Sequence, residues 1–463
     1  MKNNLLESSK KIYMTGIGGT GMSGLGRMLL NINKEVVGSD KTYSTVLDEL
    51  KAKGAKIHLT QTKKNITKDI NIFIYSHAVA PDNPEYIKAL EYGIPMLSYP
   101  EAVGLLMKTK RGVAVAGTHG KTTTASMVVS ILQSAGACPS FLIGGQMLNS
   151  GNNSGVGASD FLIVEACEYR RSFLNYSPEI AIVTNIEKDH LDYYKNITEI
   201  KRAFKRFFGN LKAGGKIIYC SDDKHTTNVA NKLKDKSTIS YGILSGDYRA
   251  ENIKVFEDFT QFDYCYKKKK IGTIKSKTHG HHNILNSLAS MICADCFGIP
   301  FELIKTGIED FKGVHRRSEV LANIKGITVI DDYGHHPTEI TCTLKSMRKL
   351  FPKSRLIVVF QPHQHSRTRI LLKDFAKSFN LADKIIVPEI FFVRDSLLEK
   401  KLVTSQVLVD KINLNGQEAI YLPSFDEIVD YLADISQPGD VILTIGAGPV
   451  DTIAKGLIAK LNV

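Results

Sequence analysis

The segment Gly117-Thr118-His119-Gly120-Lys121-Thr122-Thr123 limits what this chain can be more than any other feature of its sequence. It follows an apolar run at 113–116 that predicts a buried strand, and it precedes a run at 125–132 that predicts a helix. A glycine-rich turn in that position leaves backbone N–H groups unpaired at a helix N-terminus, where the helix dipole also attracts phosphate. Lys121 adds a positive charge, and the hydroxyl of Thr122 can ligate Mg²⁺. The segment therefore predicts a site for a nucleoside triphosphate, although Val115 stands where the general P-loop pattern has its first glycine.

The length and composition of the chain predict a globular protein with more than one hydrophobic core. A chain of 463 residues is too long for one ordinary domain, so two to four are expected. No apolar run is long enough to cross a bilayer, and the N-terminus lacks the apolar core of a signal peptide, so we expect a cytoplasmic protein without a membrane partner. Seven scattered cysteines predict reduced thiols.

The net charge of +13 is compatible with binding either nucleic acid or anionic small molecules. The only dense basic run, residues 267–270, lies between two strand-like segments and predicts a hairpin tip. Nothing resembles a modular nucleic-acid-binding motif, so we expect no nucleic-acid partner.

Alternating strand and helix signals divide the chain into three tandem α/β domains. We expect a Rossmann-like domain at 1–109, a P-loop ATPase-like domain at 110–312 and a second Rossmann-like domain at 313–463. The apolar runs expected to form strands are 12–15, 35–40, 70–76, 113–116, 160–165, 180–185, 327–332, 356–360, 384–387 and 441–445.

A second glycine turn opens the N-terminal domain. Gly16-x-Gly18-x-x-Gly21 fits the dinucleotide fingerprint, and Asp40 follows at about the expected distance. The fingerprint shows that a pyrophosphate can approach the backbone, which fits NAD or FAD but equally a UDP-sugar. Two phosphate-binding turns in one chain suggest two phosphorylated ligands.

Polar side chains end several of the expected strands. Glu165 lies where P-loop enzymes place a Mg²⁺-ligating acid, and His190 follows the next strand, so the two could hold a second ion. In the C-terminal domain, the segments 331–337 and 361–368 supply histidines, a tyrosine and Arg367, whose guanidinium could grip a small carboxylate.

Taken together, these residues resemble the Mur ligases, and within them the alanine-adding branch. The similarity covers most of the chain, in the segments 16–24, 117–124, 185–194, 282–286, 331–338 and 359–368.

The resemblance implies an ATP-dependent ligase that joins L-alanine to the carboxylate of UDP-N-acetylmuramate through an acyl phosphate, for peptidoglycan synthesis. It implies ATP and two Mg²⁺ ions, for which Mn²⁺ could substitute, and a monomer or weak homodimer. The implied ATP-binding residues outside the 117–123 segment are Asn283, Asn286, Arg317 and Asp332. The implied metal ligands are Thr122, Glu165 and His190.

The implied UDP-sugar contacts come from the glycine turn and the ends of two further strands: Gly16, Gly18, Gly19, Gly21, Met22, Ser23, Asp40 and Ser76. Tyr333, His335 and Arg367 would position L-alanine. The implied catalytic residues are Lys121, Glu165, His190, His335 and Arg367.

Some residues depart from the family pattern. Cys167 stands where many relatives have aspartate, His365 replaces a commoner tyrosine, and Pro449 follows Gly448 where aspartate is more frequent. Lys205 has the offset of a carbamylated lysine in sister ligases, but the alanine-adding branch usually lacks it, so we expect it at the surface.

Other functions stay open at this point. A ligase that attaches a recycled murein peptide to the same sugar nucleotide shares most of these motifs. In an NAD-dependent oxidoreductase the glycine turn at 16–21 would bind the dinucleotide, and a basic P-loop ATPase could act on nucleic acid.

Overall fold

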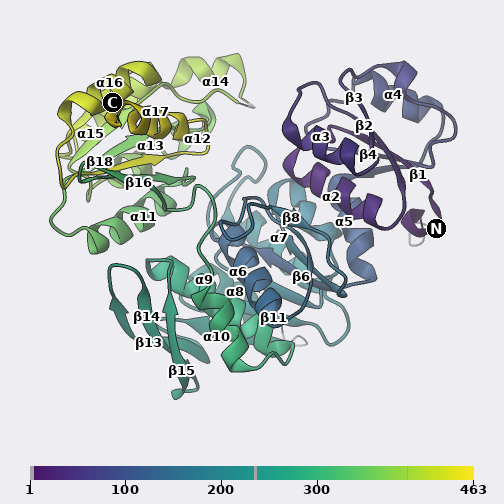
Figure 1. Ribbon diagram of the computed structural model, residues 1–463, viewed down its shortest axis with the longest axis horizontal. Coiled ribbons are helices and arrows are strands. Elements are labelled where there is room, and N and C mark those ends of the chain that lie inside the picture. Colours follow the sequence, from purple (N-terminus) through teal and green to yellow (C-terminus); the bar gives the residue numbers. More distant parts are fainter. Residues whose placement is uncertain (1–4, 234–236, 394, 463) are drawn as a thin grey trace. The chain divides into compact units, whose positions relative to one another are not determined.

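The computed structural model describes residues 5–233, 237–393 and 395–462. Within them the chain forms three sheets, each built from a separate stretch of sequence (Figure 1). The chain divides into two compact units: one contains residues up to 251, 263–274 and 285–311, and the other contains 252–262, 275–284 and the residues from 312 onward.

The N-terminal sheet has the strand order β3-β2-β1-β4-β5, and each neighbouring pair of its strands is parallel. The chain reverses its direction of strand addition at β1, so the ends of β1 and β4 open a crevice where ligands bind in such sheets. The strands are β1 Lys11–Thr15, β2 Glu35–Ser39, β3 Lys56–His58, β4 Ile72–Tyr75 and β5 Met96–Ser98. The helices are α1 Leu5–Ser8, α2 Thr20–Asn31, α3 Thr45–Ala52, η1 Lys63–Asn65, α4 Pro84–Glu91 and α5 Tyr99–Lys108.

The central sheet has the order β15-β14-β13-β12-β11-β10-β6-β9-β7-β8. Strand β6 lies between β10 and β9 and is parallel to both, which places the three strand ends at one edge. The strands are β6 Arg111–Ala116, β7 Ser140–Leu142, β8 Ser154–Gly155, β9 Phe161–Glu165, β10 Ile180–Val183, β11 Lys216–Cys220, β12 Ser237–Gly242, β13 Tyr248–Val255, β14 Thr260–Tyr266 and β15 Lys269–Ser276. The helices are α6 Lys121–Ser134, η2 Tyr169–Asn175, α7 Ile197–Gly209, α8 Lys224–Ala230, α9 His281–Cys296 and α10 Phe301–Glu309.

The C-terminal sheet has the order β16-β17-β21-β18-β19-β20, with β16 antiparallel to β17 and the other pairs parallel. The strands are β16 Glu319–Ile324, β17 Ile327–Asp332, β18 Leu356–Phe360, β19 Lys384–Val387, β20 Ala419–Tyr421 and β21 Val441–Ile445. The helices are α11 Pro337–Leu350, α12 His365–Ile370, α13 Leu372–Lys377, α14 Leu397–Leu402, α15 Ser405–Asn413, α16 Phe425–Ile435 and α17 Asp451–Leu461.

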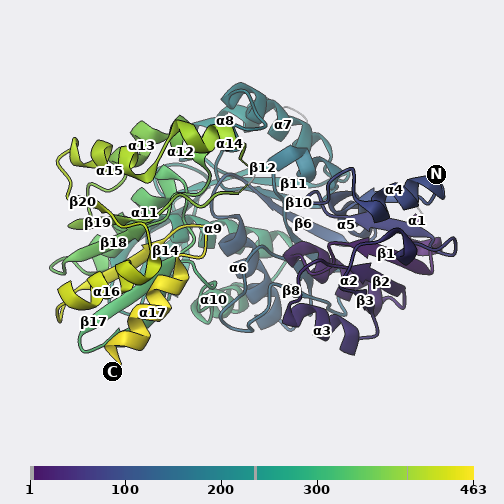
Figure 2. The same ribbon diagram turned by 90° about the horizontal axis from the view of Figure 1, so that it is seen from above.

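Successive side chains of this sheet enter two different cores. Ile330 packs in the core that holds side chains of α11, α13 and α15, whereas its neighbour Val329 packs in the core that holds α16 and α17. Figure 2 shows α13 and α15 on one side of the sheet and α16 and α17 on the other. Both faces are therefore apolar, which explains why these strands read as continuous hydrophobic runs.

The α/β fold class predicted from the sequence is confirmed. The strand bounds agree in full at β17, β18, β19 and β21. The structure shortens the expected runs at β2, β4, β9 and β10, whereas β1 begins one residue earlier than expected and β6 two residues earlier. The basic run at 267–270 lies at the β14–β15 connection, as predicted, and none of the seven cysteines, all of which the structure describes, forms a disulfide. Within the described residues, no helix combines the length and apolarity needed to cross a membrane.

Candidate active site

The turn between β6 and α6 has the backbone conformation that only glycine adopts readily. Gly117 has φ +134° and Gly120 has φ +80°. A Cβ on Gly117 would lie 2.1 Å from Thr184 Oγ1, and one on Gly120 would lie 2.5 Å from Asn286 Oδ1. Both glycines are therefore needed for the turn to pack against Thr184 and Asn286. In this conformation the backbone N–H groups of the turn lie at the start of α6.

Residues after β10 hold this turn in place. The backbone N–H of His119 donates to Asn185 Oδ1 at 2.8 Å, and that of Thr118 donates to Asn185 O at 3.0 Å. The backbone N–H of Glu187 donates to Thr118 Oγ1 at 2.8 Å. The sequence reasoning gave Asn185 no role of its own, although it ends a predicted strand.

Lys121, the first residue of α6, folds back over the turn. Its Nζ donates to the backbone oxygen of Thr118 at 2.9 Å and lies 3.2 Å from Glu168 Oε2. Burial lowers the pKa of Lys121, but the negative groups around its ammonium, of which Glu168 contributes most, together raise it by more, so the net shift is upward. Lys121 is thus a fixed positive charge at the turn, as a phosphate-binding lysine must be.

Thr122 and Glu165 are brought together as the sequence predicted. Thr122 Oγ1 donates to Glu165 Oε2 at 2.8 Å, and the backbone N–H of Gly144 donates to the same oxygen at 2.8 Å. A Cβ on Gly144 would lie 2.7 Å from that oxygen, so glycine is what admits the carboxylate. A hydroxyl beside a carboxylate is an all-oxygen donor pair of the kind that Mg²⁺ takes.

His190 lies in a different set of neighbours from the one the sequence suggested. Ligand atoms of His190, Cys167 and Glu168 all lie within 4.8 Å of one another. The His190 ring also packs on Tyr169, with centroids 4.8 Å apart, and the residue has a positive φ of 52°. The pairing of His190 with Glu165 around one ion stays a prediction.

Glu168 is the main residue that sequence reasoning missed. Its carboxylate contacts Lys121, and its backbone oxygen accepts from the hydroxyl of the buried Tyr194 at 2.6 Å. The one available signal was its position three residues after Glu165, just beyond the end of β9.

The start of α9 lies beside the turn through Asn286. Thr124 Oγ1 donates to Asn286 Oδ1 at 3.1 Å, so this asparagine contacts α6 directly. Asn283, also predicted to contact nucleotide, donates from Nδ2 to the backbone oxygen of His279 at 2.9 Å. Burial lowers the pKa of His282 to about 4, so this ring is neutral near pH 7.

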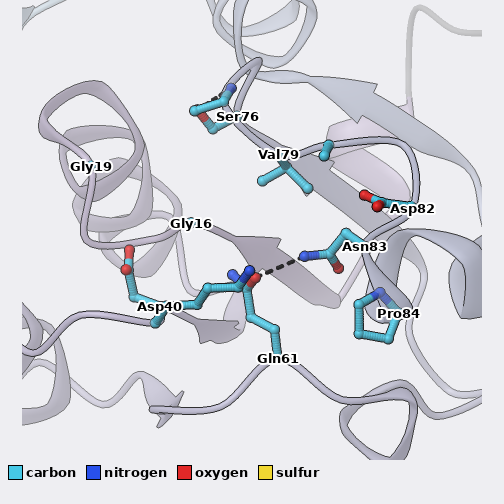
Figure 3. A pocket seen from close by; sticks show the side chains of 12 residues that line it. Gly16, Gly19, Asp40, Gln61, Ser76, Val79, Asp82, Asn83 and Pro84 are labelled. Carbon is cyan, nitrogen blue, oxygen red and sulfur yellow. Dashed lines mark hydrogen bonds between the residues drawn. The ribbon is translucent and has the colours of Figure 1, made fainter. Parts of the chain in front are cut away.

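The N-terminal domain contains a cavity of about 530 Å³ at the ends of β1, β2 and β4 (Figure 3). Of the predicted sugar-nucleotide residues, it is lined by Gly16, Gly19, Asp40 and Ser76. The sequence missed other lining residues: Lys41, Gln61, Ala78, Val79, Ala80, Asp82, Asn83 and Pro84.

Asp40 shapes the glycine turn beside this cavity. The backbone N–H of Gly18 donates to Asp40 Oδ2 at 2.9 Å, and a Cβ on Gly18 would lie at the same distance from that oxygen. A Cβ on Gly21 would lie 2.7 Å from the ring of Tyr99, so this glycine permits α2 to pack on α5. Met22 and Ser23 are buried in α2 and do not line the cavity.

A fully buried carboxylate supports the cavity from below. Glu85 is 0% exposed and accepts hydrogen bonds from Tyr13, Thr15, Ser39 and Asn65 at 2.6 to 2.9 Å. Its backbone N–H donates to Asn83 Oδ1 at 2.9 Å, and Asn83 Nδ2 in turn donates to Gln61 Oε1 at 2.7 Å, as Figure 3 shows. Glu85 thereby joins the ends of β1 and β2 to the start of α4.

The predicted amino-acid site gathers at the ends of β17 and β18. The rings of Tyr333 and His335 have centroids 5.8 Å apart, and those of His335 and His363 lie 5.9 Å apart. Arg367 Nη1 lies 3.3 Å from His363 Nδ1. Tyr333, His335 and Arg367 therefore share one neighbourhood, joined by His363, to which the sequence assigned no separate role.

Asp332 and Arg317, both expected at the nucleotide, lie in the same unit. The Asp332 carboxylate accepts from the backbone and hydroxyl of Ser318 at 2.7 and 2.9 Å and from the Gly334 N–H at 2.7 Å. Burial raises its pKa above the ordinary value. Arg317 packs over the Tyr333 ring at 5.0 Å and lies 3.8 Å from Glu339.

The departures from the family pattern fall at distinct places. The half-buried Cys167 adjoins Lys121, and burial with the charge of Glu168 raises the pKa of its thiol to about 12. The backbone N–H of His365 donates to Asp395, and Val450, after Pro449, is fully buried at the start of α17. Lys205 is exposed, as predicted.

Three family models match successive parts of the chain. They are the Mur ligase family catalytic domain at residues 11–111, the Mur ligase middle domain at 115–294 and the Mur ligase glutamate ligase domain at 316–448. The chain belongs to the Mur ligase family. Members of this family are ATP-dependent ligases, which agrees with the phosphate turn at 117–123.

Relatives and solved structures resemble the chain over its whole length. It is 42% identical to the UDP-N-acetylmuramate–L-alanine ligase of Caldanaerobacter subterraneus subsp. tengcongensis, with 98% of each chain covered. It is 39% identical to that of Desulforamulus reducens, again with 98% of each covered. The crystal structure of the corresponding Mur ligase from Thermotoga maritima is 27% identical, with a TM-score of 0.81 over 98% of this chain and 99% of that one.

A murein peptide ligase from Psychrobacter arcticus is also similar. It is 26% identical, with a TM-score of 0.72 and 98% of both chains covered. These Mur ligase relatives do not favour the oxidoreductase or the nucleic-acid ATPase as alternatives.

Proposed function

We propose that this Mur ligase joins L-alanine to the carboxylate of UDP-N-acetylmuramate at the expense of ATP, in the synthesis of peptidoglycan precursors. The observation that carries the proposal is the presence, in one chain, of the Lys121 phosphate turn and a separate cavity beside the Gly16 turn. Relatives that carry this activity in their names share 38 to 42% of their residues with the chain along its length.

A carboxylate is a poor electrophile, so it must be activated before an amine can attack it. In the proposed reaction a carboxylate oxygen attacks the γ-phosphorus of ATP, ADP leaves, and an acyl phosphate forms. The amine of L-alanine then attacks the acyl carbon, the amide bond forms, and inorganic phosphate leaves. Lys121 is placed to stabilise negative charge on the transferring phosphoryl group, because its ammonium lies at the turn where that group would bind.

UDP-N-acetylmuramate would bind in the N-terminal cavity, with its pyrophosphate against the backbone of Gly16, Gly18 and Gly19. Asp40 and Ser76 line or shape that cavity and would contact the nucleoside side. Gly21, Met22 and Ser23 would act through the shape of the turn and the start of α2.

Thr122 and Glu165 have the oxygen donors that suit Mg²⁺, and we assign one ion to them. His190 would contribute to a second ion, and Mn²⁺ could replace either. When bound, the ions offset the charge repulsion between ATP and the substrate carboxylate. The residues of this chain hold the nucleotide: the 117–123 turn takes the phosphates, and Asn283, Asn286, Arg317 and Asp332 would contact the nucleoside.

In the C-terminal domain, Tyr333, His335 and Arg367 would position L-alanine, with Arg367 gripping its carboxylate. We expect the enzyme to be a monomer or a weak homodimer, which sedimentation at several concentrations would establish.

The direct test is an amine panel. Purified full-length protein with ATP, Mg²⁺ and UDP-N-acetylmuramate should release phosphate with L-alanine and not with the murein tripeptide. The similarity to the murein peptide ligase makes that peptide the second candidate amine, and phosphate release with it alone would replace our assignment. Phosphate release with neither amine, or without the UDP-sugar, would contradict the proposed ligase function.

A further inference from the structure

Three chemically different metal-binding groups meet beside the phosphate turn. The thiol of Cys167, the carboxylate of Glu168 and the imidazole of His190 each offer a ligand atom, and these atoms all lie within 4.8 Å of one another. They come from two strand ends: Cys167 and Glu168 follow β9, and His190 follows β10.

This donor set shares His190 with the second ion proposed above, but it adds the thiol of Cys167 and the carboxylate of Glu168, which were not assigned to magnesium. Mg²⁺ takes oxygen ligands, whereas a thiolate with an imidazole and a carboxylate suits Zn²⁺ and similar soft ions. Zn²⁺ is usually four-coordinate, so three protein ligands would leave one position for water. Cys167 stands where many relatives have aspartate, so the sulfur donor distinguishes this chain from those relatives.

The surroundings permit an ion to enter. Cys167 is only half-buried, and the side chain of His190 is 19% exposed. A bound ion deprotonates a coordinating thiol outright, which removes the objection that the free thiol holds its proton. Lys121 now neutralises Glu168, and an ion at this carboxylate would compete with that contact.

We propose that Cys167, Glu168 and His190 form an inhibitory site for a thiophilic divalent cation such as Zn²⁺. An ion held there occupies the carboxylate that positions Lys121 and places a further positive charge beside its ammonium. Turnover should therefore fall when the site fills. The binding itself involves no substrate, so it can be measured whether or not the proposed ligase function is correct.

Cadmium serves as a spectroscopic probe of the site, because a thiolate bound to Cd²⁺ gives an ultraviolet charge-transfer band. Full-length, nucleotide-free protein titrated with Cd²⁺ should show this band. The band should be absent in Cys167→Ser and present in Cys138→Ser, which alters an exposed cysteine elsewhere on the chain. His190→Ala should weaken Cd²⁺ binding by at least about tenfold, as loss of one ligand predicts.

The same variants test inhibition. Zn²⁺ should lower the turnover of the wild-type protein and of Cys138→Ser at concentrations at least about tenfold below those needed for Cys167→Ser. A band that persists in Cys167→Ser, or one lost in Cys138→Ser, would overturn the site. Unchanged Cd²⁺ affinity in His190→Ala would show that Cd²⁺ binds to the thiol alone, and this would also overturn the proposed site. Because His190→Ala leaves the thiol in place, it still decides the matter should Cys167→Ser fail to fold.

Discussion

The ammonium of Lys121 lies 3.2 Å from Oε2 of Glu168, whose side chain is only 3% exposed. The two residues are 47 positions apart in sequence, and the pair forms because β6 and β9 are neighbouring parallel strands. A buried charge without a partner of opposite charge is unfavourable, so Lys121 and Glu168 stabilise each other at this buried position. Glu168 thus helps to keep Lys121 charged and at the turn, where we propose that the phosphates bind.

Replacing Lys121 with alanine should remove most of the turnover. Loss of one charge on the transferring phosphoryl group costs roughly 3 kcal/mol, or about a hundredfold in kcat. Calorimetric titration should show UDP-N-acetylmuramate still binding, because its cavity is built from other residues. The matched control is Lys205→Ala, at an exposed lysine. Turnover of Lys121→Ala within a few-fold of wild type would refute its role.

His190→Ala should raise the Mg²⁺ concentration needed for half-maximal turnover. The remaining oxygen ligands would then hold the second ion without the imidazole. The measurement is a Mg²⁺ titration of initial rates at fixed ATP, repeated with Mn²⁺. A curve that superimposes on that of the wild type would show that His190 does not ligate the catalytic ions.

Arg367→Lys should impair the use of L-alanine more than the use of ATP. An ammonium lacks the fork of parallel donors that a guanidinium presents to a carboxylate. The KM for alanine should rise at least about tenfold, roughly 1.4 kcal/mol, with that for ATP little changed. Arg369→Lys is the control, since Arg369 lies on the same helix but pairs with Glu399 at the surface. If the KM for ATP rises instead, Arg367 contacts phosphate.

Glu85→Gln should weaken binding of the UDP-sugar, although residue 85 does not contact this ligand. The amide nitrogen replaces one of the two oxygens, so it presents N–H donors to two groups that already donate: Tyr13 and Asn65 at the Oε1 position, or Thr15 and Ser39 at the Oε2 position. An unsatisfied buried group costs about 1 to 3 kcal/mol, so the free energy of unfolding should fall by that amount. The KM for UDP-N-acetylmuramate should rise while that for ATP stays constant. Glu91→Gln, at the exposed end of α4, should change neither the free energy of unfolding nor the KM for UDP-N-acetylmuramate. If Glu85→Gln has the same KM for UDP-N-acetylmuramate as the wild type, Glu85 has no positioning role.

Acid should destabilise the protein partly through His282. Burial lowers the pKa of this ring to about 4, below its ordinary value of about 6.5. Between these values the unfolded chain binds a proton that the folded chain does not, so stability falls as the pH decreases from about 6.5 to about 4. The nearby charged groups Glu339, His281 and Arg317 are left in place by His282→Gln. Denaturant unfolding over this range should show a shallower pH slope for the variant, and identical slopes would contradict the prediction.

The strands that carry the site could be located from the sequence because both faces of these sheets are buried. β17 and β18 have the predicted bounds, since a strand covered on both sides is a continuous apolar run with a polar residue at its end. The phosphate turn could also be predicted from the sequence, because Gly117 and Gly120 take a positive φ that other residues avoid. The sequence by itself therefore determined the fold class, the phosphate turn and the polar strand ends.

Only the tertiary structure decided which of those polar ends meet. Glu168 could not be ranked above its neighbours by spacing, because its contact with Lys121 depends on the pairing of β6 with β9. Glu85 is a similar case: Pro84 and Glu85 suggest no more than a helix start, yet four donors from distant segments converge on its carboxylate. A local pattern fixes the conformation of a segment, whereas a buried charge is selected by partners that strand order alone brings within reach.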